Sequence, residues 1–162
     1  MSTPLNSAHQ PEFGIQRVYT KDLSFEAPNT PAIFKSNFQP QLNLNLQTSQ
    51  TKLEGDDYEV VLKLTVTATT QDKTAFLAET QQAGIFTLKS FTQEQVGPVL
   101  SITCPTILFP YAREAIANLV SHGSFPQLHL APINFEALYH EQLKQQQAQQ
   151  SQQTVTEKTD EQ

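Results

Sequence analysis

The sequence is short of cysteine, tryptophan and glycine, and these shortages exclude several kinds of site. Its 162 residues include one cysteine, no tryptophan and five glycines. A single thiol, Cys104, cannot form an intramolecular disulfide, and this usage fits a reducing cytosol. The glycines are scattered, so there is no glycine-rich loop to hold phosphate. We therefore expect no nucleotide-binding site. Without one, the protein can act only through binding equilibria.

Positive charge is scarce as well. Ten Lys and Arg residues stand against 16 Asp and Glu residues, which gives a formal net charge of −6 and a pI near 5.1. Nucleic acids and anionic membrane surfaces bind basic patches, so neither is an expected partner. The acidic balance permits a partner that carries a basic patch of its own.

No segment has the composition of a targeting or membrane-spanning element. The N-terminus lacks the basic start and apolar run of a signal peptide. The longest weakly polar stretch, residues 96–112, contains three prolines and makes a poor membrane span. We therefore expect a cytoplasmic protein that does not insert into membranes.

Catalytic and metal-binding patterns are missing. Cys104 lies between apolar and β-branched neighbours, which indicates a buried structural thiol rather than a nucleophile. No two of the four histidines have the spacing of a metal-ligand pair with a carboxylate nearby. We expect no catalytic residue, no metal site and no cofactor. An enzyme using Cys104 or paired carboxylates is a minor alternative, and a thiolate titrating near neutral pH would revive it.

Four segments show the alternation of β-strands. They are residues 14–27, 42–47, 58–70 and 73–88. In the first, alternation breaks near Lys21 and Asp22, which predicts a β-bulge there. Short turns follow, around residues 54–57 and 71–73, and turns of this length imply antiparallel pairing.

The pattern then becomes helical. Thr92 and Gln95 have the spacing of a capping box. A helix is predicted from Pro110 at its first position to Gly123 just past its end. Asn134 is expected to cap a last helix. Strands followed by helices predict an α+β domain: a four-stranded antiparallel sheet with helices packed on one face.

The two ends differ in composition from the middle. Residues 1–12 are expected to be flexible, residues 13–144 to fold, and the Gln-rich residues 145–162 to form a disordered tail. The last helix could extend through residues 145–150, because glutamine is a fair helix former.

Two groups of side chains suggest binding surfaces. Asp22 and Glu26 lie four apart in a strand and share a face if no bulge intervenes, and Glu79 lies on another strand. Such a patch is either a solubility feature or a docking site for a basic partner. Most of the aromatic residues must be core, but a subset could line a groove for apolar peptide segments. This subset comprises Phe34, Phe38, Phe109, Tyr111 and Phe125.

Several segments, taken in order, resemble the SecB family of protein-export chaperones. They are YTKDLSFEAPN at 19–29, QAGIF at 82–86, CPTILFPYARE at 104–114 and GSFPQLHLAPINF at 123–135. The resemblance covers roughly residues 13–143. It implies a homotetramer, assembled as a dimer of dimers, that binds unfolded secretory preproteins without ATP and delivers them to the SecA motor.

The resemblance also assigns residues to roles. It implies that Asp22, Glu26, Leu77 and Glu79 dock SecA, and that the tail assists. It extends the client groove to residues beside Phe38 and to the loop after Gly123, including Leu128. The strand and helix pattern itself predicts self-association through the strand bearing Ala78, Thr80 and Gln82 or through the first helix, and a solvated sheet face is the alternative. Two residues depart from the family pattern: Phe38 stands where tryptophan is usual, and Ala78 where cysteine is familiar.

One alternative uses the same fold. A SecB-like chaperone can be dedicated to a toxin–antitoxin system, with one specific client instead of many. Genome neighbourhood would separate the two roles.

Overall fold

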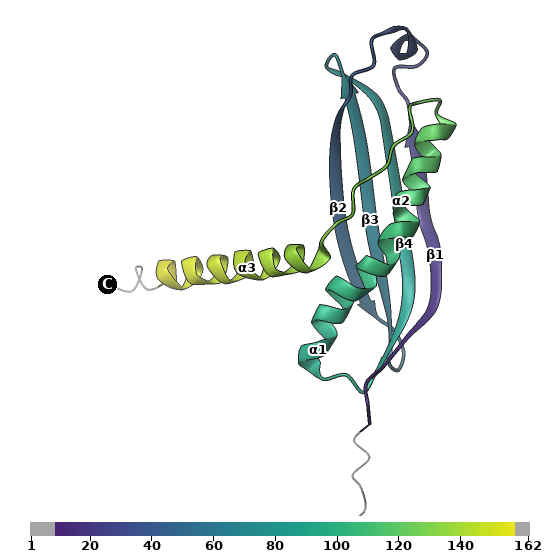
Figure 1. Cartoon of the computed structure of the whole chain (residues 1–162). Helices are drawn as coiled ribbons and strands as arrows, with labels where there is room; N and C mark the ends of the chain where they lie inside the picture. The colour runs from purple at the N-terminus through teal and green to yellow at the C-terminus, as the bar shows by residue number, and fades with distance from the viewer. Residues whose placement is uncertain (1–8, 158–162) are drawn as a thin grey trace, which may run out of the picture.

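A computed structural model describes residues 9–157, with side chains placed as far as Ser151. It contains one four-stranded sheet with a long helix along one face (Figure 1). The strands are β1 (Glu12–Glu26), β2 (Gln41–Lys52), β3 (Asp57–Thr70) and β4 (Lys73–Lys89). All pairings are antiparallel, so the predicted α+β class is confirmed.

The strand order in the sheet is β1-β4-β3-β2. Strands β2 to β4 form a meander, whereas β1 pairs with the far side of β4. The chain therefore passes from one edge of the sheet to the other through a short 3-10 helix, η1 (Ala32–Lys35). Both β1 and β2 are edge strands, each with one side that pairs with no described strand.

Two irregularities interrupt the pairing of β1 with β4. One lies between Thr20 and Asp22, as the sequence predicted, and the other, between Ile15 and Arg17, was not foreseen. Beyond the bulge at Lys21, Leu23 pairs with Thr80 and Phe25 with Ala78. Directly paired residues point to the same face, so Leu23 and Phe25 face the helices.

The helical part begins at the predicted capping box, but no break separates its first short helix from the next one. Helix α1 (Gln93–Pro98), a π-helical turn η2 (Val99–Thr103) and α2 (Cys104–His122) follow one another without a break. The capping box at Thr92 is confirmed, with the Thr92 N–H donating to Gln95 Oε1 at 3.0 Å.

The prediction that Pro110 starts α2 is wrong. Pro105 occupies the first turn of α2, and Pro110 lies inside the helix. A proline here cannot donate a hydrogen bond to the Thr106 carbonyl. Both Pro110 and Thr106 are exposed, so water can satisfy that carbonyl and the helix continues.

The end of α2 is a Schellman motif built on Ser124 rather than on Gly123. Ser124 has the left-handed φ of 63° and its N–H donates to Ser121 O at 3.1 Å, while the Phe125 N–H donates to Val120 O at 3.3 Å. Gly123 has an ordinary φ of −77°. Glycine is required there for another reason: a Cβ would lie 2.3 Å from Cζ of Phe25.

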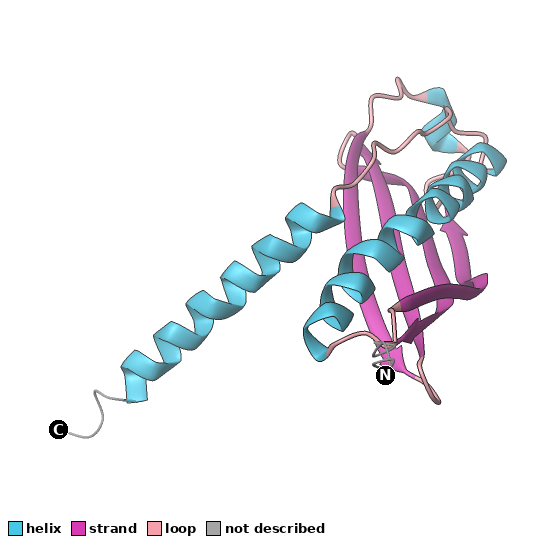
Figure 2. Cartoon of the chain, turned by 60° about the horizontal axis from the view of Figure 1, so that its bottom comes forward, coloured by secondary structure: helices cyan, strands magenta, loops and turns pink. Residues whose placement is uncertain are grey.

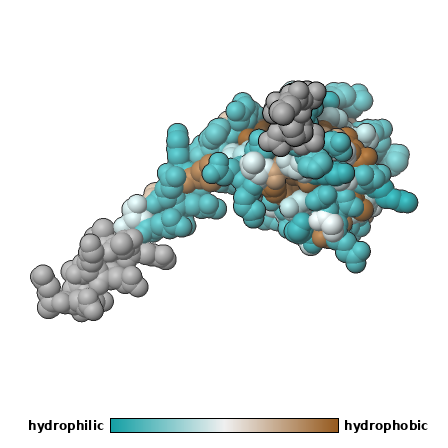
Figure 3. Space-filling model, turned by 90° about the horizontal axis from the view of Figure 1, so that it is seen from below, coloured by the Kyte–Doolittle hydropathy of each residue, from teal (hydrophilic) through white to brown (hydrophobic). Residues whose placement is uncertain are grey.

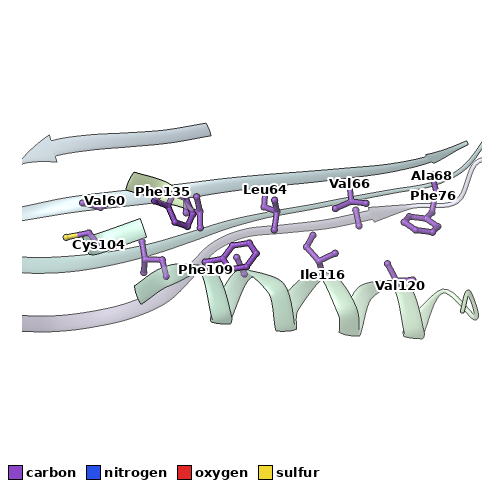
Figure 4. Packing of buried hydrophobic residues seen from close by; sticks show 14 of the residues in the cluster. Val60, Leu64, Val66, Ala68, Phe76, Cys104, Phe109, Ile116, Val120 and Phe135 are labelled. Carbon is purple, nitrogen blue, oxygen red and sulfur yellow. The ribbon is translucent and has the colours of Figure 1, made fainter. Parts of the chain in front are cut away.

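The core lies between α2 and the helix-facing side of β3 and β4 (Figure 4). The inward residues of β3 are fully buried, including Val60, Leu62, Leu64 and Val66. On α2 the buried residues recur at helical spacing: Leu108, Ala112, Ile116 and Val120. Because α2 packs on this face of the sheet, the other face is left without a covering helix.

Helix α3 (Phe135–Glu157) begins at the predicted cap and then leaves the sheet (Figures 1 and 2). Asn134 Oδ1 accepts a 3.0 Å hydrogen bond from the Ala137 N–H. Phe135 is buried and packs edge-on against Phe109, which anchors the first turn.

Helix α3 continues through residues 145–150, as the sequence allowed, and runs on to Glu157, so the helix reaches further into the Gln-rich tail than expected. Glutamine and alanine favour the helix once Phe135 has anchored its start. The surface of α3 is mainly hydrophilic (Figure 3). Residues 1–8 and 158–162 of the predicted terminal segments lie outside the described residues. Between residues 9 and 157, no helix combines the length and apolarity needed to cross a bilayer.

Candidate functional site

The described part of the chain offers neither a cluster of metal ligands nor an accessible thiol. No group of three His, Cys, Asp or Glu side chains there could hold a metal ion. Cys104 is buried, and this burial raises the pKa of its thiol to about 12. Since a thiolate is the nucleophilic form, Cys104 is an inert core residue at physiological pH.

Five phenylalanines form one aromatic cluster at the end of the sheet next to η1. They are Phe25, Phe34, Phe38, Phe76 and Phe125. Phe125 lies at its centre, with ring centroids 5.3 Å from Phe34, 5.6 Å from Phe38 and 5.0 Å from Phe76. Phe125 is buried, whereas Phe34 keeps 49% of its surface exposed. The cluster therefore presents apolar ring surface to solvent from a rigid base.

The predicted groove is brought together only in part. Phe34, Phe38 and Phe125 meet, and Phe25 and Phe76 join them although sequence reasoning did not select these two. Leu128 is half-buried against the core. The missed pair could have been found from strand parity, because both residues fall on the helix-facing side of their strands.

Phe109 and Tyr111 do not belong to the aromatic cluster. Phe109 is buried under α3, while Tyr111 is 50% exposed on the other side of α2. Two residues along a helix turn by about 200°, so these two rings must point to opposite sides. Tyr111 instead lines a hollow of about 470 Å³ between α2 and β1, together with Val18, Leu23 and Leu119.

The residues assigned to self-association lie inside the protomer. Ala78 and Thr80 are 0% exposed and Gln82 is 4% exposed, because even-numbered β4 residues face the helices and are covered. The role of Ala78, Thr80 and Gln82 in self-association stays a prediction, and within one protomer their side chains are covered. Gln82 lines the hollow beside β1 and donates from Nε2 to Tyr19 O at 3.0 Å.

The opposite face of the sheet is largely polar, although Val61, Leu77 and Ile85 also lie on it. We call it the open face, because no described helix covers it (Figure 1). Strand β2 contributes only amide and hydroxyl side chains to it: Gln41, Asn43, Asn45, Gln47, Ser49 and Thr51. A face of this composition suits a polar partner and not an apolar peptide.

All four predicted docking residues lie on the open face. Glu26 pairs with Leu77, and Asp22 pairs with Gln81 two residues beyond Glu79. The bulge at Lys21 precedes Asp22, so it restores the parity that points Asp22 and Glu26 away from the helices. The structure thus brings Asp22, Glu26, Leu77 and Glu79 together on two adjacent strands.

We call Asp22, Glu26, Leu77 and Glu79 the docking patch, after their predicted role. The three carboxylates of the docking patch differ in their surroundings. Glu79 accepts a 2.9 Å hydrogen bond from the Thr65 hydroxyl and lies 3.4 Å from Lys63 Nζ. Asp22 and Glu26 are exposed, and neither side chain has a hydrogen-bond or ion-pair partner among the described residues. The patch therefore combines two free carboxylates with one that is already paired.

A second polar group lies further along the open face. Lys21 Nζ donates to Glu59 at 2.8 Å, and the Tyr19 hydroxyl donates to the other Glu59 oxygen. Burial, aided by the hydrogen bond to Glu59 and its charge, raises the Tyr19 pKa to about 12. Hydrogen bonds from Lys21 and Tyr19 lower the pKa of Glu59. The group ties the bulge of β1 to β3 across β4.

One solved structure shares the fold, and a second gives a weaker match. A structure of the Mycobacterium tuberculosis SecB-like chaperone Rv1957, in complex with a ChAD peptide from the Rv1956 HigA1 antitoxin, matches with a TM-score of 0.61 and 16% identity, over 75% of this chain and 87% of that one. A Streptococcus agalactiae protein of unknown function gives a TM-score of 0.38 and 11% identity, over 75% of this chain and 98% of that one.

The family comparison covers most of the chain. The model of the family described as preprotein translocase subunit SecB matches residues 6–146. That span includes the whole sheet, α1, α2 and the start of α3. The chain belongs to the SecB family of chaperones.

Proposed function

We propose that this chain is an ATP-independent holdase that binds unfolded secretory preproteins in the cytosol. It keeps them competent for translocation and delivers them to the SecA motor. One observation carries the proposal: exposed aromatic surface and free carboxylates lie on opposite faces of one sheet. Phe25 belongs to the aromatic cluster and its neighbour Glu26 to the docking patch. A client and a motor can therefore occupy the protein at the same time.

Client holding uses the aromatic cluster. Phe34 offers an exposed ring on a packed base, and such surface binds apolar segments without reading an exact sequence. Binding only the unfolded state lowers the concentration of free unfolded chain by mass action. Several such sites in one assembly give avidity from weak contacts.

Self-association uses the edge formed by β1. Its outer side pairs with no described strand, and Leu23 of β1 and Tyr111 of α2 expose about half of their surfaces beside it. A second copy could pair with this edge and cover both side chains. This contact would give a dimer, and we propose that two such dimers associate into the homotetramer.

An aggregation assay tests the holdase function. A denatured precursor protein diluted into buffer without ATP should aggregate less when this chain is present at one tetramer per precursor. The variant Phe34→Ser should suppress aggregation less well, whereas Lys89→Met, remote from the cluster, should match the wild type. Unchanged aggregation with the wild type would contradict the proposal.

Motor docking is tested on the open face. The variant Asp22→Asn/Glu26→Gln/Glu79→Gln should bind SecA more weakly and hold clients normally, because its aromatic cluster is intact. A matched variant, Glu54→Gln/Asp56→Asn/Glu94→Gln, removes the same charge outside the patch and should keep wild-type binding. If the first variant binds SecA as the wild type does, the patch serves solubility alone.

A chaperone dedicated to one toxin–antitoxin system is the second candidate. The observation that favours it is the fold match to the SecB-like chaperone solved with an antitoxin peptide. This role predicts one specific client in a pull-down and a toxin–antitoxin pair in the genome neighbourhood. The export role predicts many secretory clients and SecA binding.

A further inference from the structure

Glu79 is held on both sides by its own protein. One carboxylate oxygen accepts a 2.9 Å hydrogen bond from Thr65, its direct neighbour on β3, and the other lies 3.4 Å from Lys63. Lys63 pairs with Gln81, so its ammonium reaches Glu79 diagonally across the strands. The side chains of Lys63 and Glu79 are 38% and 21% exposed, which makes this a solvated pair and not a buried one.

The neighbouring acids carry no such counter-ion. Lys21, the cation next to Asp22 in the chain, is engaged with Glu59 at 2.8 Å. Lys63 lies within ion-pair distance of a docking-patch carboxylate, and no other cation among the described residues does. A partner that offers cations to all three acids therefore meets two open positions and one occupied position.

We propose that Lys63 competes with the docking partner for Glu79, so that docking replaces the Lys63–Glu79 pair with a pair between Glu79 and a cation of the partner. The proposal deepens the docking function proposed above and rests on it. The Lys63–Glu79 pair would limit the affinity of the chaperone for SecA, since a carrier must leave the motor after each delivery.

The surroundings of Lys63 make this exchange local. A hollow of about 250 Å³ on the open face is lined by Asn45, Gln47, Lys63, Thr65 and Glu79. Amide oxygens of Asn45 and Gln47 can accept from an ammonium that has left Glu79. The released Lys63 therefore stays solvated without rearrangement of the backbone.

The expected effect is modest and positive. Removing the competing charge should tighten SecA binding about two- to fivefold, the range expected of a single exposed ion pair. The gain should shrink as salt rises, because exposed charges are screened. If Lys63 instead supported the structure of the docking patch, its removal would weaken SecA binding.

A double-mutant cycle tests the proposal. Calorimetric titration of SecA into the wild type, Lys63→Met, Glu79→Gln and the double variant should show tighter binding for Lys63→Met alone. In the Glu79→Gln background the same change should have no effect. Lys63→Arg keeps the cation and should retain wild-type affinity.

Lys89→Met is the matched control, since Lys89 is exposed and lies roughly 30 Å from Glu79 at the other end of β4. It should not change the dissociation constant. Equal affinity of Lys63→Met and wild type would overturn the proposal. A gain that persists without Glu79 would also overturn it, because net charge would then explain the effect. Absence of any wild-type binding would instead refute the docking function on which it rests.

Discussion

At the scale of single residues, Gly123 shows how a glycine can be required by a neighbour and not by its own backbone. Its φ of −77° is open to any residue, yet a Cβ would meet Cζ and Cε1 of Phe25 at 2.3 and 2.6 Å. Phe25 is packed by Phe76 and Phe125 and has little room to move. The glycine therefore sets how closely α2 approaches the aromatic cluster.

We expect Gly123→Ala to destabilise the protein by about 1–3 kcal/mol through overpacking. Urea unfolding followed by circular dichroism measures this. Gly97→Ala is the control, because a Cβ there would lie 3.5 Å from the Tyr139 hydroxyl, an ordinary contact, and alanine favours a helix. Equal stability of Gly123→Ala and the wild type would show that Phe25 moves freely.

Tyr19 and Glu59 predict a pH dependence of stability at both ends of the scale. The Tyr19 pKa is raised from 10.0 to about 12 in the folded protein, so this contribution is complete below pH 10 and is lost as the pH rises through 12. The Glu59 pKa is lowered from 4.5, so its contribution is present above that pH and is lost as the pH falls.

Urea unfolding at a series of pH values checks both. The alkaline loss should be smaller in Tyr19→Phe, and the acid loss smaller in Glu59→Gln. Because the two side chains share a hydrogen bond, Glu59→Gln should also weaken the alkaline effect. Identical pH profiles for all three proteins would contradict the assignment.

At the scale of elements, the bulge at Lys21 decides which side chains reach the docking patch. Thr20 pairs with Gln82 and Asp22 with Gln81, so Lys21 is the extra residue between two regular pairs. Deleting Lys21 leaves those pairs adjacent and keeps Asp22 and Glu26 on the open face. Inserting one residue after Lys21 would turn both toward the helices if the bulge did not grow.

We therefore expect the Lys21 deletion to cost about 0–1 kcal/mol, the value of its exposed ion pair with Glu59, and to preserve SecA binding. An alanine inserted after Lys21 should weaken both binding and stability, since Phe25 would leave the aromatic cluster. Calorimetry with SecA and urea unfolding compare the two. Loss of binding in the deletion variant would show that Lys21 itself contacts the motor.

Elements with strong alternation were predictable from the sequence, and so was the bulge, because both leave local patterns. The start of α2 was not. Pro110 has the features of a first helical residue, but the apolar spacing already holds from Cys104, and buried contacts at Leu108 and Ala112 outweigh one lost hydrogen bond. Local signals identify an element more reliably than its ends.

Site residues were predictable where the alternation of side chains along one strand determines which face they lie on. They were missed where the alignment of neighbouring strands determines the contact. Asp22, Glu26 and Glu79 share the open face once the bulge is known. The partnership of Glu79 with Lys63 depends on how β3 aligns with β4, which no local pattern specifies. The same register buries Ala78 and Thr80, which the sequence had assigned to a subunit contact.

At the scale of the whole molecule, the exposed edge of β1 predicts the assembly. The wild type should be a tetramer in native mass spectrometry, and Leu23→Asp should lower its oligomeric state by placing a charge beside the unpaired strand. Leu53→Asp is the control, because Leu53 is similarly exposed but lies outside the strands. A tetramer unaffected by Leu23→Asp would place the contact elsewhere.

The strand order also has a consequence for how the chain acquires this shape. Each of β2, β3 and β4 finds its neighbour next in sequence, so these hairpins can close early and locally. Strand β1 must wait for β4, since even its nearest partner, Leu77 for Glu26, is synthesised much later. Until then the apolar residues of β1 and the free side of β4 stay uncovered. During its own synthesis, this chain therefore exposes for a time the kind of apolar surface that chaperones bind in their clients.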